Sequence, residues 1–252
     1  MMKKRHEMEV IAVDTIAKET IEMTLYQPEI SQQTMPGQFL HLLVPGFTLR
    51  RPISIAKVNS EEGTVTILFK VVGGGTKALA AYQPGMTVDA LGPNGNGFQV
   101  DDVQEGERIL LVGGGIGVPP IYHLAKRLSE KNVELVAVLG FQSKDYVFYE
   151  EAFQKIAETY VVTNDGSYGH QGFVTHVFSE VGAFDQYFSC GPLPMLRAVT
   201  TELKDAAGKV SLEERMGCGV GACMACVLPT VDNSYKKICS DGPVFSAQEV
   251  IL

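Results

Sequence analysis

Four of the five cysteines lie in the last 35 residues, and their spacing restricts what this part of the chain can become. Cys218, Cys223 and Cys226 form a C-x4-C-x2-C motif, and Cys239 follows after twelve further residues. Glycines between these cysteines relieve backbone crowding and leave N–H groups free to face sulfur. Thiolates at this spacing are typical ligands of a [2Fe-2S] cluster. The odd number of cysteines in the chain argues against a framework of disulfides.

A structural zinc site with four thiolates is the competing interpretation of the cysteine motif, and uncoordinated thiols are the third. Zinc sites usually show two short cysteine pairs, whereas here three cysteines fall within nine residues and the fourth stands alone. The spacing therefore favours iron and sulfide. Because residues 210–252 are too few for an apolar core of their own, we expect something other than hydrophobic burial to organise them.

The first hundred residues contain short β-forming runs separated by turn residues. The runs cover residues 9–16, 21–26, 39–44, 53–58, 64–72 and 87–91. One short helix is predicted at residues 76–82, and no helix of ordinary length separates the runs. This pattern predicts an antiparallel β-barrel over residues 1–101.

The pattern changes after residues 92–97, a loop rich in glycine and asparagine. Apolar strands are predicted at residues 108–112, 133–139, 160–163 and 187–189, and helices at residues 120–131, 149–156 and 194–206. Alternating strands and helices predict a parallel-sheet α/β domain over residues 102–209. The boundary with the barrel lies near residues 100–103, and residues 210–252 form a C-terminal segment.

Composition and charge exclude several classes of function. The chain has 252 residues, of which 45% are hydrophobic, so it can bury a core in two domains. Its formal net charge of −8 repels nucleic acid. Glycine and proline interrupt the longest uncharged stretch, at residues 109–125, so we expect no membrane span. Acidic residues follow the basic start of the chain where a signal peptide would be apolar, and we expect a cytoplasmic protein.

A glycine-rich loop follows the first predicted strand of the α/β domain. Its candidate ligands for a nicotinamide dinucleotide are Gly113, Gly114, Gly115, Gly117 and Pro120. A strand, a glycine turn and a helix beginning at proline can present amides and a helix dipole to phosphate. Proline replaces the third glycine of the G-x-G-x-x-G motif. A tight turn between strand and helix that binds no ligand would have the same sequence pattern, so it is the alternative interpretation.

Two segments of the barrel could hold a second diphosphate. Arg51 begins a predicted strand, and Lys70 ends another, just before the glycine run that leads to Thr76. An arginine forks onto phosphate, and Gly75 with Thr76 can supply amides and a hydroxyl. A solvated surface charge and a simple turn are the alternatives. Together with the cysteine motif, the loops indicate a relay of nicotinamide, flavin and iron–sulfur cluster.

The order of these motifs resembles the ferredoxin-NADP reductase superfamily over nearly the whole chain. The sequence from Arg51 to Ser54 resembles the R-x-Y-S flavin motif, residues 115–120 match the G-x-G-x-x-P nicotinamide loop, and Cys190 begins a C-G-P element. The resemblance implies an antiparallel flavin-binding barrel, a parallel-sheet nicotinamide domain and a C-terminal [2Fe-2S] segment. Ile53 replaces the tyrosine of the flavin motif, which removes an aromatic stacking partner.

The segments at residues 213–226 and 239–245 narrow the resemblance to the electron-transfer subunits of type B dihydroorotate dehydrogenases. That family binds FAD and one [2Fe-2S] cluster. It passes electrons from the FMN of a catalytic subunit to NAD⁺ in de novo pyrimidine (UMP) biosynthesis, within a heterotetramer of two subunits of each kind. The resemblance assigns FAD to Arg51, Pro52, Ile53, Ser54, Leu68, Phe69, Lys70, Gly75 and Thr76. It assigns the cluster to the four C-terminal cysteines and places Cys190 in the nicotinamide pocket.

No recognisable motif supplies a base for dihydroorotate oxidation, so we expect no activity on dihydroorotate from this chain alone. Its five histidines are scattered and are interpreted as surface or satisfied core residues: His6, His41, His123, His170 and His176. The alternative interpretation of Cys190 is a buried thiol at the end of a strand. Residues 140–145 lack an arginine for a 2′-phosphate, which favours NAD, although Lys144 leaves NADP open.

Two other functions fit the same motifs. One is the small subunit of an NADH-dependent ferredoxin-NADP reductase or of a sulfide dehydrogenase, which differs only in its partner. The other is a zinc-stapled binding module without catalytic activity, and finding zinc in place of iron would support it.

Overall fold

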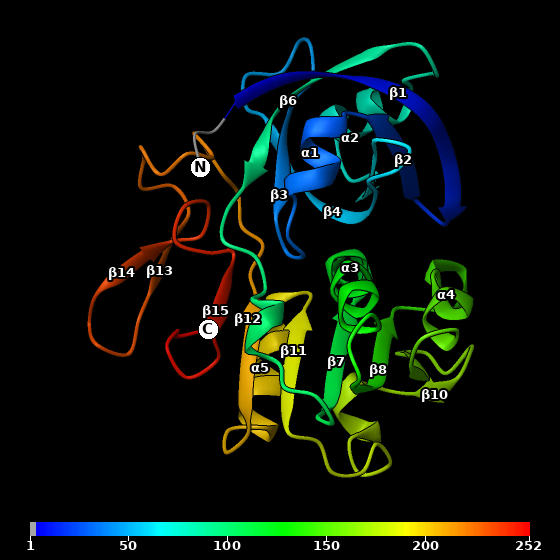
Figure 1. Ribbon diagram of the computed structural model, residues 1–252, viewed down its shortest axis with the longest axis vertical. Helices are drawn as coiled ribbons and strands as arrows, with labels where there is room; N and C mark the ends of the chain where they lie inside the picture. Colours follow the sequence, from blue (N-terminus) through cyan, green and yellow to red (C-terminus); the bar gives the residue numbers. More distant parts are fainter. Residues whose placement is uncertain (1–3) are drawn as a thin grey trace.

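The computed structural model describes residues 4–252, and it contains a barrel packed against an open α/β sheet (Figure 1). The barrel comprises the blue and cyan elements of Figure 1, and the green and yellow elements form the sheet and its helices. The C-terminal segment, in orange and red, returns alongside both.

Six antiparallel strands close the barrel in the order β1-β2-β5-β4-β3-β6. Its elements are β1 (Lys4–Ala17), β2 (Thr20–Tyr26), α1 (Pro28–Gln33), β3 (Phe39–Leu43), β4 (Arg51–Asn59), β5 (Thr64–Lys70), α2 (Gly74–Ala80) and β6 (Thr87–Asn94). Alternate side chains of these strands point inward and form the barrel core. The predicted barrel and its α2 helix are confirmed. Helix α1 was not predicted, because six residues give no helical periodicity.

Strands of the second sheet are ordered β10-β9-β8-β7-β11-β12-β15, all parallel except β15, which runs antiparallel to β12. Its elements are β7 (Arg108–Gly114), α3 (Val118–Leu128), β8 (Glu134–Phe141), α4 (Glu150–Gln154), β9 (Glu158–Thr163), β10 (His170–Gln171), β11 (Gln186–Cys190), α5 (Leu193–Glu202), β12 (Ala207–Ser211) and β15 (Val244–Ser246). Short 3₁₀ turns lie at Val100–Asp102, Gly115–Gly117, Lys144–Tyr146 and Val174–Val177. The predicted parallel sheet is confirmed.

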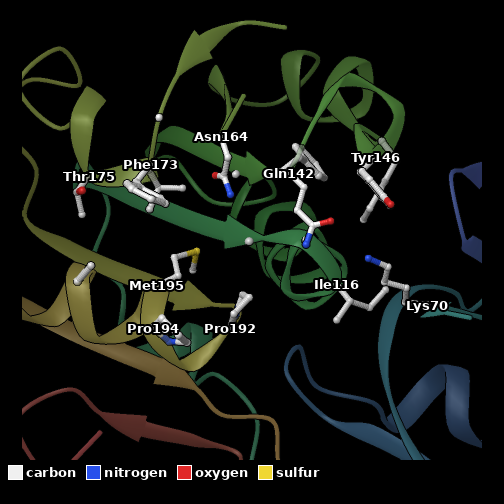
Figure 2. Close-up of a pocket in the computed structure, with 18 of the residues that line it drawn as sticks. Lys70, Ile116, Gln142, Tyr146, Asn164, Phe173, Thr175, Pro192, Pro194 and Met195 are labelled. Atoms are coloured by element: carbon white, nitrogen blue, oxygen red, sulfur yellow. The ribbon is translucent and has the colours of Figure 1, made fainter. Parts of the chain in front are cut away.

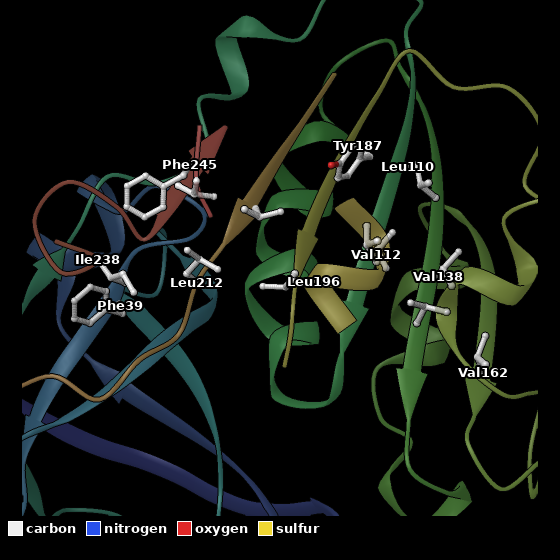
Figure 3. Packing of buried hydrophobic residues seen from close by; sticks show 14 of the residues in the cluster. Phe39, Leu110, Val112, Val138, Val162, Tyr187, Leu196, Leu212, Ile238 and Phe245 are labelled. Carbon is white, nitrogen blue, oxygen red and sulfur yellow. The ribbon is translucent and has the colours of Figure 1, made fainter. Parts of the chain in front are cut away.

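Both faces of this sheet are buried. Along β7, Ile109 and Leu111 join the core that contains helix α3, while Leu110 and Val112 join the core that contains Leu196 of α5 (Figure 3). Alternation therefore places one layer of apolar side chains on each face. Chain order reverses between β7 and β11, so a crevice opens at the carboxyl ends of these two strands.

The C-terminal segment contains a hairpin of β13 (Val227–Pro229) and β14 (Tyr235–Lys237), followed by β15 at the edge of the sheet. Its buried side chains Leu212, Ile238 and Phe245 belong to the same core as α5. Figure 3 shows Ile238 beside Phe39 of the barrel. The expectation that something other than hydrophobic burial organises this segment is thus wrong. The segment has no separate core because it packs into that of the sheet.

The limits that we predict between domains stay predictions. The first, at residue 101, falls within the 3₁₀ turn Val100–Asp102. The second, at residue 209, falls inside strand β12, so the sheet continues into the C-terminal segment. No helix among residues 4–252 is both long and apolar enough to cross a membrane.

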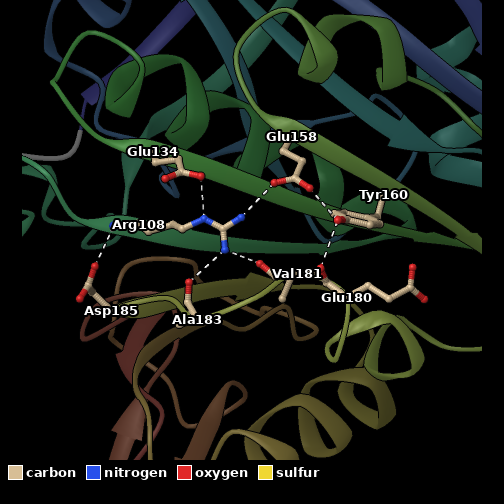
Figure 4. A network of polar contacts seen from close by, with 8 residues as sticks. All are labelled: Arg108, Glu134, Glu158, Tyr160, Glu180, Val181, Ala183 and Asp185. Atoms are coloured by element: carbon tan, nitrogen blue, oxygen red, sulfur yellow. Dashed lines mark hydrogen bonds and ion pairs between the residues drawn. The ribbon is translucent and has the colours of Figure 1, made fainter.

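Arg108 fastens the amino ends of the strands, at the edge of the sheet opposite the crevice (Figure 4). Its guanidinium donates to Glu134 at 2.7 Å, to Glu158 at 2.9 Å and to the Ala183 carbonyl at 3.0 Å. The carbonyl of Val181 accepts a further hydrogen bond. These carboxylates hold the pKa of Arg108 above its ordinary value. The side chain therefore joins β7, β8 and β9 to the loop before β11.

We expect Arg108→Ala to lower the free energy of unfolding by about 2 kcal/mol, because two carbonyl oxygens and two carboxylates lose their donor. Urea denaturation would measure the change. Arg127→Ala is the matched control, since its pair with Glu130 is exposed and 3.7 Å long. That variant should differ from the original chain by no more than about 0.5 kcal/mol. Equal effects of both substitutions would contradict a structural role for Arg108.

Candidate functional site

A cavity of about 560 Å³ opens at the carboxyl ends of the parallel strands (Figure 2). Gln142 follows β8, Asn164 follows β9, and Met195 lies in the first turn of α5. Thr20 and Lys70 of the barrel complete the wall, so both domains contribute to the cavity. Most of its lining is apolar, as in sites that hold planar organic cofactors. No histidine among residues 4–252 lines this cavity.

The structure divides the five predicted nicotinamide ligands into two groups. Gly114 and Gly115 line the cavity. Gly115 has a φ of +51° and open space where a side chain would project. Gly113, Gly117 and Pro120 do not line it. A Cβ on Gly117 would lie 2.3 Å from the carbonyl oxygen of Cys190, so this glycine permits the loop to pack closely against β11.

Cys190 ends strand β11 beside Gly113 and is fully buried. Burial raises the pKa of its thiol well above the ordinary value, and the nearby carboxylate of Glu213 adds to that shift. The thiol is therefore protonated at neutral pH and is not a reactive nucleophile. It belongs to the core that contains helix α3 and does not line the cavity.

Glu213 is a residue of this region that the sequence interpretation missed. The residue follows β12 and is exposed, and Ser54 of β4 donates a hydrogen bond to its carboxylate. Desolvation of the carboxylate raises the pKa of Glu213, although the hydrogen bond from Ser54 opposes the shift. One signal could have found it: an acid that follows a buried strand at the carboxyl edge of a parallel sheet.

Arg51 lies against the start of helix α2. A Cβ on Gly75 would be 2.3 Å from its Nε, so only glycine lets the guanidinium approach this backbone. The ring of Phe47 is 4.7 Å from its Cζ, which is a cation–π contact. No carboxylate within residues 4–252 forms an ion pair with Arg51. Its charge is therefore available to an anion such as a flavin diphosphate.

The other predicted FAD residues lie in several surroundings. Thr76 accepts hydrogen bonds from the amides of Val72 and Gly73, at 3.0 and 3.2 Å, and so holds the glycine loop. Leu68 and Phe69 are buried in two different cores, so only their backbone can reach a ligand. Lys70 lines the cavity. Pro52, Ile53 and Ser54 lie half-buried on β4, next to Arg51.

The four C-terminal cysteines are brought together as two pairs. Cys218 contacts Cys223, and Cys226 contacts Cys239. The amide of Ile238 donates to the Cys226 carbonyl at 2.9 Å, which joins the two segments that carry the second pair. Two thiolates for each of two metals is the ligand arrangement of a [2Fe-2S] cluster. Among residues 4–252, no three or more histidine, cysteine, aspartate or glutamate side chains are grouped closely enough to hold one metal ion.

Backbone amides face the sulfurs of these cysteines. Those of Val220 and Cys223 lie 3.5 and 3.3 Å from Cys218 Sγ, and that of Gly221 lies 3.2 Å from Cys239 Sγ. Burial opposes ionisation of Cys218, but these donors outweigh it and lower its pKa to about 6. The loop therefore favours the thiolate of Cys218, which is the form that binds iron, whereas burial and the neighbouring Cys226 raise the pKa of Cys239 to about 11. The residues fit the group that their spacing predicts.

Comparison with known proteins follows the same division of the chain. A family model described as the iron–sulfur cluster binding domain of dihydroorotate dehydrogenase B matches residues 213–251. A model described as the oxidoreductase FAD-binding domain matches residues 7–98. The dihydroorotate dehydrogenase B (NAD(+)) electron transfer subunits of Bacillus cereus (strain AH187) and Bacillus anthracis (strain A0248) are each 50% identical over 260 aligned residues, covering 100% of both chains. The chain belongs to this family of electron transfer subunits.

A solved structure of another oxidoreductase has the same fold as this chain. The structure of an NADH-dependent reduced ferredoxin-NADP oxidoreductase superposes with a TM-score of 0.89 and is 31% identical. The match covers 97% of this chain and 89% of that one. The family match to an iron–sulfur domain favours the cluster over the zinc-stapled module that the spacing left open.

We expect Arg51→Ala to weaken retention of FAD by about 1–3 kcal/mol, the cost of a lost charge-assisted contact. Titration of the flavin-free protein with FAD would measure the affinity. Arg51→Lys keeps the charge but not the planar fork, so its affinity should be intermediate. An affinity unchanged in Arg51→Ala would contradict a role at the diphosphate.

We expect Cys226→Ser to abolish the cluster and to leave FAD bound, because the flavin motif lies in the barrel. Iron, acid-labile sulfide and flavin contents of the purified variant would test this. Cys190→Ala is the matched control, since it also removes a buried thiol but should keep the iron. Loss of FAD together with iron would show that the C-terminal segment forms part of the flavin site.

Proposed function

We propose that this chain passes electrons between FAD in the barrel, a [2Fe-2S] cluster in the C-terminal segment and NAD⁺ at the crevice. Its partner would be the FMN-containing catalytic subunit of a dihydroorotate dehydrogenase, in de novo pyrimidine biosynthesis in the cytoplasm. The observation that most supports this proposal is that the three predicted cofactor sites adjoin one another. Both domains line the cavity, and the segment with the cysteines packs against barrel strand β3. Full-length relatives at 50% identity support this partner.

Each set of residues has one task in this proposal. Arg51, Ser54 and the loop held by Thr76 would bind FAD and orient it toward the crevice. Gly114 and Gly115 leave room for a dinucleotide, and the apolar lining excludes water from the nicotinamide. The paired cysteines would hold the cluster. When bound, the flavin supplies exchange between two-electron and one-electron chemistry.

The cavity favours NAD over NADP. Lys70 is the one charged side chain that lines it within residues 4–252, and it comes from the barrel. Lys144, which left NADP open in the sequence, does not line the cavity, and its Nζ lies 6.0 Å from the ring of Tyr168. Within residues 4–252, the cavity is thus lined by no cation from the sheet side that could bind a 2′-phosphate.

A second candidate function has a specific observation in its favour. The 0.89 TM-score with an NADH-dependent ferredoxin-NADP oxidoreductase extends the likeness beyond the fold, since the two chains are also 31% identical. A subunit of that kind would use the same internal sites with a different partner. The higher identity and complete coverage of the dihydroorotate dehydrogenase B relatives favour the first proposal.

The test is recovery of the tagged chain, with its bound partner, from the cells that produce it. We expect the complex to reduce NAD⁺ when dihydroorotate is added, and two copies of each subunit by mass. The separated chain should show no dihydroorotate oxidation, although NADH reduces its flavin. Reduction of ferredoxin or NADP⁺ by a flavin- and iron-loaded complex that ignores dihydroorotate would replace the first proposal with the second.

A further inference from the structure

One buried histidine of the barrel contacts the cluster-binding loop. His41 lies in the middle of β3 and is fully buried. A Cβ on Gly219 would lie 2.2 Å from its Nδ1 and 2.7 Å from its Cε1. Gly219 also has a φ of +68°, a conformation that favours glycine. The imidazole thus occupies the space that a side chain at residue 219 would need, directly beside the cluster ligand Cys218.

The same strand is paired with the flavin motif. In the ladder between β3 and β4, His41 is opposite Pro52, Leu42 is opposite Arg51, and Phe39 is opposite Ser54. The guanidinium of Arg50 donates to the His41 carbonyl at 3.1 Å, which fixes the backbone at this point. The strand that carries His41 is therefore hydrogen-bonded to the strand that carries the predicted FAD residues Arg51 to Ser54. The side chain of His41 also contacts the loop that is predicted to bind the cluster.

The two arms of the cluster-binding segment are held differently. The arm with Cys239 is secured by several contacts: Phe39 packs into its core, and the side chain of Asn96 donates to the carbonyls of Ser240 and Asp241 at 3.2 and 3.0 Å. The arm with Cys218 meets the barrel at Gly219 and His41. A change at His41 should accordingly move one half of the cluster relative to the flavin.

We propose that His41 is a positioning residue, which holds the Cys218 arm against β3 and so sets the rate of electron transfer between flavin and cluster. The inference rests on the proposed function. In that function electrons would reach the cluster from the partner, and FAD would deliver them in pairs to NAD⁺ as hydride. NADH would drive the same transfer in reverse, one electron at a time from flavin to cluster. The transfer rate falls steeply as the two centres separate, so the fold must fix their spacing.

The experiment compares four variants of the flavin- and iron-loaded protein. His41→Ala removes the ring, and Gly219→Ala presses on the same contact from the loop. His123→Ala is the matched control, because His123 is also a buried histidine but lies on helix α3. Stopped-flow absorbance would separate reduction of the flavin by NADH from reduction of the cluster, and electron paramagnetic resonance would record the spectrum of the reduced cluster.

We expect cluster reduction to slow by about tenfold or more in His41→Ala and in Gly219→Ala, as is usual when a residue that supports metal ligands is lost. Flavin reduction by NADH should be unchanged, and the spectrum of the reduced cluster should shift. His41→Asn, whose amide replaces Nδ1, should recover most of the rate. Iron lost from the first two variants but retained by His123→Ala would also support the positioning role.

Cluster reduction at the original rate with an unaltered spectrum in both variants would overturn the inference. So would an equal slowing in His123→Ala, because the effect would then come from general loosening of the protein. The proposed function fails separately: it fails if NADH reduces the flavin of the unsubstituted protein and the cluster never accepts an electron.

Discussion

Strand β3 is the element on which the relative placement of the three sites depends. One edge of it pairs with β4, which carries the flavin motif, and its side chains Phe39 and His41 contact the C-terminal segment. A segment as short as this one cannot bury a core by itself, so it must pack against a neighbour. By sharing the core of the sheet and contacting β3, it brings the cysteines to a fixed position beside the barrel. The cavity wall contributed by Lys70 and Thr20 joins the remaining site to the same barrel.

The elements that could be predicted are those whose pattern is local. Alternating apolar residues predict the barrel strands, and buried runs between amphipathic helices predict the parallel sheet. Strand β15 could not be predicted, because its three residues are a strand only through pairing with β12, more than 30 residues earlier in the chain. Likewise, the burial of Ile238 and Phe245 follows from a core to which distant segments contribute. Local patterns carry no record of such partners.

Site residues follow the same rule. The cysteine motif could be read from spacing, because one short loop sets most of its geometry. Gly117 reads as a ligand in the sequence, whereas the structure uses it to pack against Cys190, which is more than 70 residues away. His41 reads as a scattered histidine, and its contact with Gly219 joins two segments that no motif connects. Function predicted from motifs therefore identifies the cofactors better than the residues that set the distances between them.

Two adjacent arginines show how far local chemistry departs from overall charge. Arg50 forms an ion pair with Asp89 at 2.7 Å and so links two segments of the barrel. Arg51 beside it forms no ion pair with a carboxylate among residues 4–252. The net charge of −8 repels extended polyanions, whose charges act over many residues. At physiological ionic strength, however, that repulsion is screened beyond about 8 Å. A diphosphate held against Arg51 responds to the nearest charge. A negative protein can therefore reject nucleic acid and still bind an anionic dinucleotide, provided that one arginine is kept free of carboxylates.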